Sequence, residues 1–146
     1  MSPSPSAPPT TPTATLSLRL RTVPGRYAVA QLPANAPFPA WADGPGLCAL
    51  VRASDELSVV CLQERVPSDV RAERDWICLR TVGPFDFQAA GIVHALIQPL
   101  STQGIGVFVV CTFDGEHLLI AARDEEKARG LLRAAGHEWH ALLHGN

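Results

Sequence analysis

The sequence predicts an α+β fold on the ferredoxin-like βαββαβ plan, and three observations support this prediction. Apolar residues make up 47% of the 146 residues, which is enough to form the core of one domain or of two very small ones. The first stretch after a Pro-rich start alternates leucines with polar residues, which is the period of a half-buried strand: Leu16, Leu18 and Leu20. The second half alternates strand-like apolar runs with two helix-like stretches.

The first half of the chain is predicted to consist of strands joined by turns. "TLSLRLRT" and "YAVAQL" are two predicted strands, and "VPGR" between them predicts a turn. The Pro- and Gly-rich run that follows leaves room for one short helical turn at residues 39–42. "GLCALVRA" and "ELSVVCL" predict two further strands, and "QERVPSDVRAER" predicts a linker. This half therefore has the strands of the plan, with its helices shortened to turns.

The second half follows the plan more closely. "DWICLRTV", "IGVFVVCT" and "EHLLIAA" predict strands, with an Asp-Gly hairpin between the last two. Residues 86–103 predict a helix with an apolar stripe, in which Asp86 is the N-cap and Pro99 removes one hydrogen bond near the end. "DEEKARGLLRAAG" predicts a second helix that begins at the cap Asp124. The closing "HEWHALL" fits either a strand or a helical tail.

These patterns predict a tandem arrangement. We expect a disordered tail at residues 1–14, which are rich in Pro, Ser and Thr and carry no charged side chain. A degenerate N-terminal unit is expected at residues 15–70, and a complete C-terminal unit at residues 71–146. The strand at residues 105–112 is apolar on both faces. We therefore expect the first half, or a second copy of the chain, to cover the face that the helices leave open.

Composition narrows the possible partners. The net charge is −2 and no basic block occurs, so no nucleic-acid partner is expected. No apolar run approaches the roughly 18 residues that span a bilayer, and the start of the chain lacks the basic and apolar regions of a signal peptide. The cysteines are spaced too widely for a CxxC pair, which indicates reduced, buried thiols in a cytoplasmic protein: Cys48, Cys61, Cys78 and Cys111.

No catalytic, metal or cofactor site is predicted. His137, His140 and His144 would share one face of a helix and could then meet a metal ion. No acid or cysteine completes that set, so a tail of unrelated histidines is the preferred interpretation. The sequence also shows no Ser-His-Asp order, Gly-rich phosphate loop or paired carboxylates. The chain is therefore not expected to be an enzyme, and no cofactor is expected.

The stretch "GPFDFQAAGIV" at residues 83–93 is the candidate binding site. One interpretation is structural: Asp86 caps the helix, while Phe85 and Phe87 pack as a hydrophobic staple and as core. The other is functional. Small residues follow, so the first amides of the helix are open to a carboxylate, and Asp86 is suited to hold an ammonium group. A free amino acid carries both of these charges.

The residues carry a resemblance over nearly all of residues 16–136. "DELSVVCLQERVP", "GPFDFQAAGIVHALIQPLSTQGIGVFVVCTFDGEHLLI" and "DEEKARGLL", together with "VPGRYAVAQLP" and "FPAWA" in the first half, resemble bacterial ACT-domain proteins of the short tandem kind. These are relatives of the CASTOR-type arginine sensors and of the aspartate kinase regulatory domain. The resemblance implies a non-catalytic fold of two ACT-like βαββαβ units. It also implies that an amino acid or similar small metabolite binds at the interface between units, with a homodimer as one expected assembly.

The resemblance also implies which residues form the site. They lie in the loop and first helical turn after the opening strand, and in the strand that faces them: Phe85, Asp86, Phe87, Ala90, Gly91, Ile92, Thr112, Phe113 and Asp114. The sequence departs from the family pattern twice, because Ala90 stands where a hydroxyl residue is usual and Gly115 lies in the usually more polar hairpin. The alternative is therefore an ACT scaffold without a ligand, acting in protein interaction or dimerisation.

Overall fold

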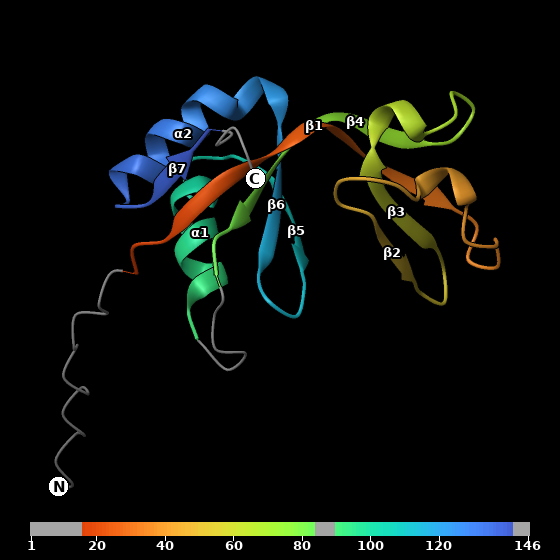
Figure 1. Ribbon diagram of the computed structural model, residues 1–146, viewed down its shortest axis with the longest axis horizontal. Coiled ribbons are helices and arrows are strands. Elements are labelled where there is room, and N and C mark those ends of the chain that lie inside the picture. Colours follow the sequence, from red (N-terminus) through yellow and green to blue (C-terminus); the bar gives the residue numbers. More distant parts are fainter. Residues whose placement is uncertain (1–15, 84–89, 142–146) are drawn as a thin grey trace, which may run out of the picture.

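The computed structural model describes residues 16–83 and 90–141. Its helices and strands follow one another along the chain in the order β, 3₁₀, β, β, 3₁₀, β, α, β, β, 3₁₀, α, β (Figure 1). Their bounds are β1 Arg19–Leu32, η1 Ala40–Ala42, β2 Ala49–Arg52, β3 Leu57–Leu62, η2 Gln63–Arg65, β4 Ala72–Thr81, α1 Ile92–Ser101, β5 Val107–Cys111, β6 Glu116–Ala121, η3 Ala122–Asp124, α2 Glu125–Ala134 and β7 Glu138–His140.

The described strands form one seven-stranded sheet in the order β2-β3-β1-β4-β6-β5, with β7 beside the start of β1. All pairs are antiparallel except β1 with β7. The two long strands, β1 and β4, pair with each other and run from one lobe of the molecule into the other (Figure 1). They connect the two lobes, which otherwise have separate strands.

This topology contains the ferredoxin-like arrangement twice, as predicted. In the first unit the order β4-β1-β3-β2 places the last strand beside the first, with η1 and η2 where helices would lie. In the second unit the start of β1 lies between β7 and β4, because β1 pairs with both. The second unit therefore contains a strand from the other end of the chain. The division at residue 70 stays a prediction, since β1 and β4 each belong to both lobes.

The predicted "VPGR" turn between two strands is wrong, because β1 continues through it for 14 residues. The pairing of β1 with β4 shifts register between Val23 and Tyr27, so the strand bends there without reversing. Gly25 at this bend has φ +97°, and a Cβ on it would lie 2.6 Å from Cδ2 of Leu62. The Pro-Gly pair thus marks the bend at which β1 passes from the second unit to the first.

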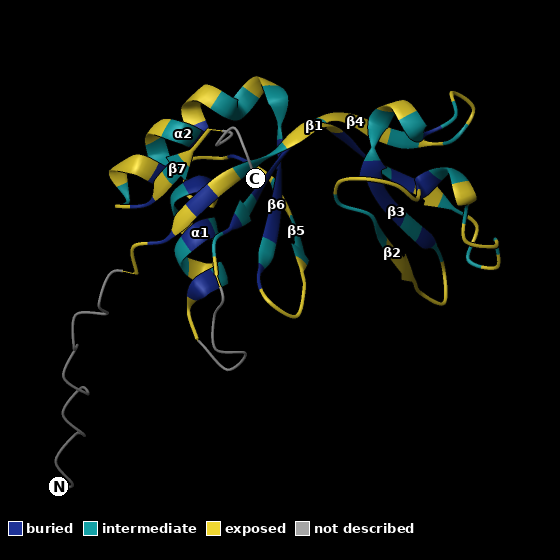
Figure 2. Cartoon of the chain, viewed as in Figure 1, coloured by how far each residue is buried: buried dark blue, intermediate teal, exposed yellow. Residues whose placement is uncertain are grey.

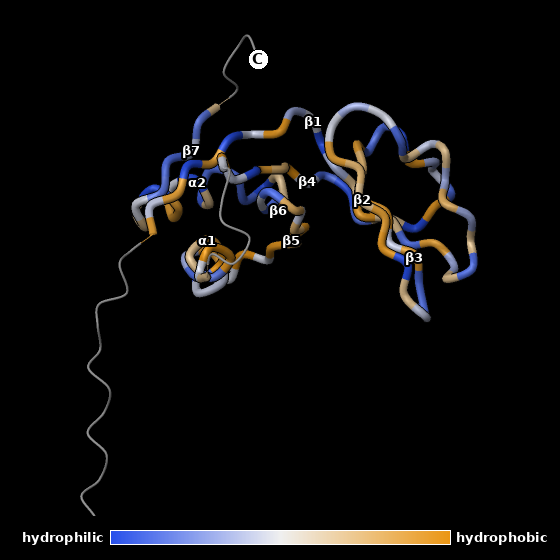
Figure 3. Tube along the Cα trace, turned by 60° about the horizontal axis from the view of Figure 1, so that its bottom comes forward, coloured by the Kyte–Doolittle hydropathy of each residue, from blue (hydrophilic) through white to orange (hydrophobic). Residues whose placement is uncertain are grey.

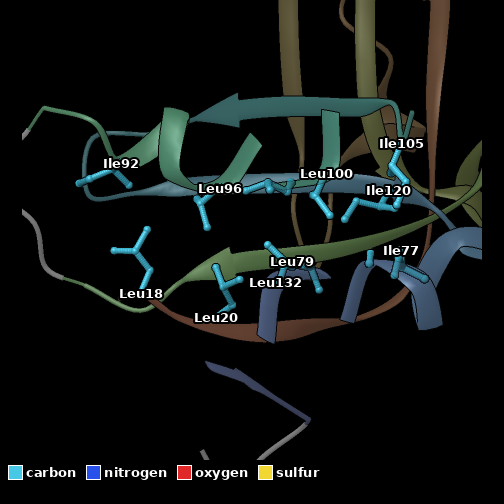
Figure 4. Close-up of a cluster of buried hydrophobic side chains, with 12 residues drawn as sticks. Leu18, Leu20, Ile77, Leu79, Ile92, Leu96, Leu100, Ile105, Ile120 and Leu132 are labelled. Atoms are coloured by element: carbon cyan, nitrogen blue, oxygen red, sulfur yellow. The ribbon is translucent and has the colours of Figure 1, made fainter. Parts of the chain in front are cut away.

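Helices α1 and α2 cover one face of the second unit. Buried residues of α1 recur every four positions along its apolar stripe: Ile92, Leu96 and Leu100. They meet leucines and isoleucines from β1, β4 and β6, and Leu132 of α2 closes the cluster from the other helix (Figure 4). The exposed residues of α2 lie on its outer surface (Figure 2). This core holds α1 firmly on the sheet.

The predicted helix over residues 86–103 is shorter in the structure. It begins at Ile92, and Gly91 is its N-cap residue in the left-handed conformation, with φ 85°. Asp86, the predicted cap, lies outside the described residues. The helix starts after Gly91 because a left-handed residue cannot continue a right-handed helix.

Pro99 lies inside α1, as predicted, and leaves the carbonyl of Ala95 without its usual helical donor. His137 replaces that donor, with Nε2 at 3.0 Å from the Ala95 oxygen. The amide of Leu18 donates to the other ring nitrogen, Nδ1, at 3.1 Å. Because Nδ1 is an acceptor, Nε2 carries the proton. His137 is buried, and it joins α1, the start of β1 and the end of α2.

The segment "HEWHALL", predicted to be either a strand or a helical tail, contains a strand in the structure. Residues 138–140 form β7, parallel to β1, so the helical face on which the histidines would gather does not form in the described part of the chain.

Asp124 occupies the N-cap position of α2 as predicted, without a side-chain cap bond. Within residues 16–83 and 90–141, no helix is long and apolar enough to cross a membrane.

The first unit uses short turns where the second has helices. The predicted helical turn at residues 39–42 is confirmed by η1, and its Ala42 is fully buried against β3. Three arginines fasten the surrounding loops to backbone carbonyls. Arg52 donates to Ala34 and Ala36, Arg65 to Ala42 and Pro45, and Arg74 to Gln63, Val66 and Pro67.

Candidate functional site

A groove of about 630 Å³ runs along α1, between the segment before β1 and the end of α2. Its walls are formed by small and apolar residues together with three polar side chains spaced one helical turn apart: His94 and Gln98 of α1, and its C-cap residue Thr102. The remaining lining residues are Leu16, Ala90, Gly91, Ala95, Pro99, Ala135 and His137. No charged carboxylate, lysine or arginine lies among these lining residues, so the described part of the groove suits a neutral or zwitterionic ligand.

The N-terminal end of α1 opens onto this groove, because Gly91 and Ala90 form part of its wall. The cap residue Gly91 has no side chain that could accept from the first amides of the helix, and the first intrahelical bond runs from the amide of Ala95 to the carbonyl of Gly91, at 2.9 Å. The earlier amides of a helix have no intrahelical acceptor and carry the positive end of its dipole. This end of the groove is therefore suited to a carboxylate group.

The structure places the residues implied by the resemblance in different surroundings. Phe85, Asp86 and Phe87 lie outside the described residues. Ala90 and Gly91 line the groove. The side chain of Ile92 is buried in the cluster between the sheet and helices α1 and α2, which we call the helix-side core.

The other three, Thr112, Phe113 and Asp114, belong to the β5–β6 hairpin and do not line this groove. The hairpin itself is confirmed: the amide and hydroxyl of Thr112 both donate to the carbonyl of Gly115, at 2.8 and 3.1 Å. Phe113 is 79% exposed.

Sequence reasoning missed the groove residues His94, Gln98 and Thr102. Their four-residue spacing on the polar side of α1 is visible in the sequence, yet such a stripe is the ordinary composition of a solvated helix face. His137 was missed for another reason. Its role depends on contacts with Leu18 and Ala95, which are 119 and 42 positions away.

The cysteines in the described residues are all free thiols, as predicted. Burial raises the pKa of Cys78 to about 12, although Arg80 opposes that shift. Burial is also the main cause that raises the pKa of Cys48 and of Cys61. The prediction that all four are buried holds for Cys61 and Cys78, whereas Cys48 is half-buried and Cys111 is exposed at the end of the edge strand β5. Among described residues, no group of His, Cys, Asp and Glu could hold a metal ion.

Two family models match the chain. The ACT domain model matches residues 71–134, and a model described as an N-terminal domain matches residues 25–69. No curated protein matches the chain.

Several solved structures are similar. A crystal structure of protein Atu0741 from Agobacterium tumefaciens is 47% identical, with a TM-score of 0.84, over 90% of this chain and 98% of that one. A protein of unknown function from Vibrio cholerae, titled a possible transport protein, is 14% identical with a TM-score of 0.67, over 82% and 91% of the two chains. The ligand-free regulatory subunit of aspartate kinase from Thermus thermophilus is 14% identical with a TM-score of 0.54, over 80% and 95%.

The similarity to the Vibrio cholerae and Thermus thermophilus proteins shows a shared fold only, because each sequence is only 14% identical to this chain. The alignment with the Agobacterium tumefaciens protein covers nearly the whole of both chains, at an identity that indicates common descent. Together with the repeated βαββαβ topology and the match at residues 71–134, it leads to one conclusion: the chain belongs to the ACT-domain family.

Proposed function

We propose that this protein is a non-catalytic regulatory ACT module that binds an amino acid or similar small metabolite beside the entry of α1. The observation that supports this most directly is the groove of about 630 Å³ onto which the N-terminal end of α1 opens. A volume of this size is within the range of small-molecule sites. The likeness to regulatory subunits of aspartate kinase supports a regulatory role.

The chemistry of the groove fits a zwitterion. A carboxylate would accept from the free amides at the start of α1, near the positive end of the helix dipole. The carboxylate of Asp86, five positions before Gly91, would pair with the ammonium group. His94, Gln98 and Thr102 would contact the ligand side chain along the groove. In this proposal the hairpin residues Thr112, Phe113 and Asp114 complete the site from a neighbouring ACT unit.

A thermal-shift screen against the twenty amino acids tests the proposal. A ligand at a hundred times its dissociation constant stabilises the native state by about 2.7 kcal/mol, which such a screen detects. For the amino acid that responds, calorimetry should then show at least tenfold weaker binding to Asp86→Ala and weaker binding to His94→Ala. Ser101→Ala is the matched control, because Ser101 is exposed on the same helix and outside the groove. Affinity is the readout, because a change in melting temperature alone does not separate lost binding from lost stability.

The second candidate is a ligand-free scaffold that associates through its sheet edges. The edge strands β2 and β5 are strongly apolar (Figure 3). They expose Val51 at 61%, and Leu50 and Phe108 at 37% each. Exposed apolar edge strands readily pair with another chain. No response to any amino acid, together with a dimer in analytical ultracentrifugation that Val51→Lys dissociates, would favour this candidate over the first.

A further inference from the structure

A row of basic residues crosses the second unit on the sheet face opposite the helices. Arg21 of β1 is the register partner of both His140 in β7 and Arg80 in β4, and Arg80 is the partner of His117 in β6. Register partners on neighbouring strands point to the same face. Their chain neighbours Leu20, Leu79 and Leu118 belong to the helix-side core, so the row points away from the helices.

The two arginines of this row have no counter-ion in the described structure. Neither Arg21 nor Arg80 makes a side-chain hydrogen bond or ion pair there, whereas Arg52, Arg65 and Arg74 all donate to backbone carbonyls. Like charges placed directly opposite each other destabilise a sheet. Glu138 lies one row away, opposite Arg19, and its carboxylate is 3.2 Å from Nε2 of His140. Glu138 thus lies on the same face as the row, where it pairs with His140 and forms no ion pair with Arg21 or Arg80 in the described structure.

His117, at the end of the row, is only 8% exposed, and its Nδ1 is buried with no hydrogen-bond partner in the described residues. Buried ring nitrogens in native proteins nearly always have one. Burial, and then Arg80 and Arg21, lower the pKa of His117 to about 4. The ring is thus neutral at pH 7, and a nearby anion would reverse the effect of the arginines on it.

We propose that Arg21, Arg80 and His117 bind a small anionic ligand through a phosphoryl or carboxylate group. Neighbouring strands lie about 4.8 Å apart, so one oxyanion can reach the guanidinium groups of both arginines. The occupant is a small molecule, because only a small group can reach a side chain as buried as His117. Beside this row, Val23 is the half-buried edge of an apolar cluster and would contact a nonpolar part of the ligand, while Cys78 and Leu119 lie fully buried beneath it. This site is separate from the groove along α1 and does not depend on the proposed function.

The test is a titration of the full chain at low ionic strength in chloride, with inorganic phosphate in one arm and citrate in the other. We expect calorimetric binding of at least one anion, and a rise in the pKa of His117 followed by NMR. Arg80→Gln and Arg21→Gln should each weaken the association at least tenfold. Arg123→Gln removes the same charge from an exposed position in η3 and should leave the affinity within twofold. Preference for phosphate or for citrate identifies the phosphoryl or the carboxylate class.

A second readout separates a ligand site from a structural role. In the same chloride buffer without phosphate or citrate, Arg21→Gln should melt at the same temperature as the wild type or higher, because it removes the repulsion with Arg80. Added phosphate or citrate should then stabilise the wild type and not the variant. Absence of binding in both arms, equal weakening by Arg123→Gln, or binding only of an acidic polypeptide would overturn the proposal.

Discussion

In the second unit α1 and α2 cover one face of the sheet, whereas in the first unit the corresponding face carries 3₁₀ turns and loops. The second unit buries a continuous cluster of leucines and isoleucines under its helices. The first unit buries smaller residues, among them Ala28, Ala30 and Ala42, under its turns. Turns bring less apolar area to a sheet than amphipathic helices do, so the first unit needs other contacts.

The arginines of the two units also differ in the contacts that they make. In the first unit they hold loops in place by donating to carbonyls, and Arg52 also lies 4.8 Å from the ring of Phe38. In the second unit Arg21 and Arg80 donate to nothing in the described structure and lie opposite each other. These two arginines therefore keep a free positive charge, although Arg129 of the second unit lies 4.0 Å from the ring of Trp139. In the first unit, arginine bonds to backbone carbonyls thus accompany turns in the place of helices.

The largest expected effect is in the helix-side core. Leu96→Ala should lower the free energy of unfolding by about 2–5 kcal/mol, because Leu96 is fully buried and its loss leaves a cavity. Urea denaturation measures the change. Gln98→Ala, an exposed position on the same helix, should stay within about 0.5 kcal/mol of the wild type. Equal losses in both variants would mean that α1 is not anchored through its apolar stripe.

The next effect depends on pH. The pKa of His117 is lowered to about 4 in the folded protein, so the unfolded chain binds the proton more readily. The stability that the neutral ring contributes is complete above pH ~6.5 and is lost as pH falls toward ~4. Between those values, urea denaturation in chloride should show the wild type losing about 3 kcal/mol more than His117→Gln. His94→Gln, at an exposed position, should follow the wild type; parallel curves for wild type and His117→Gln would contradict the prediction.

The smallest effect tests the first unit. Arg65→Met should lower the free energy of unfolding by about 1–2 kcal/mol, because it removes the donor to Pro45, 2.6 Å away, and the weaker one to Ala42. Arg71→Met removes the same charge from an exposed arginine with no side-chain bond in the described structure, and should change little. If both variants unfold alike, the arginine contacts do not replace helix packing.

Local patterns were enough to predict most elements. The apolar stripe of α1 and the Asp-Gly hairpin each depend on neighbours a few positions away, and the structure confirms them. The strand predicted from the alternation of residues 16–22 is confirmed only from Arg19 onward, because Leu16 lies before β1 and is 39% exposed. The predictions were wrong where one local sequence pattern is compatible with two different backbone structures. A Pro-Gly pair can reverse a chain or bend a strand, and at residues 24–25 only the pairing of β1 with β4 decided between them. Likewise Gly91 delayed the start of α1 beyond its predicted entry.

The sequence by itself determined the βαββαβ plan and the family resemblance, because these follow from residue order and spacing, whereas the candidate site at the entry of α1 stays a proposal. Tertiary structure alone decided that β1 enters the second unit, that His137 takes the place of the missing Pro99 donor, and that His140, Arg21, Arg80 and His117 form one row. The reason is physical: strand register and buried hydrogen bonds join residues that are far apart along the chain, and no local pattern specifies such partners.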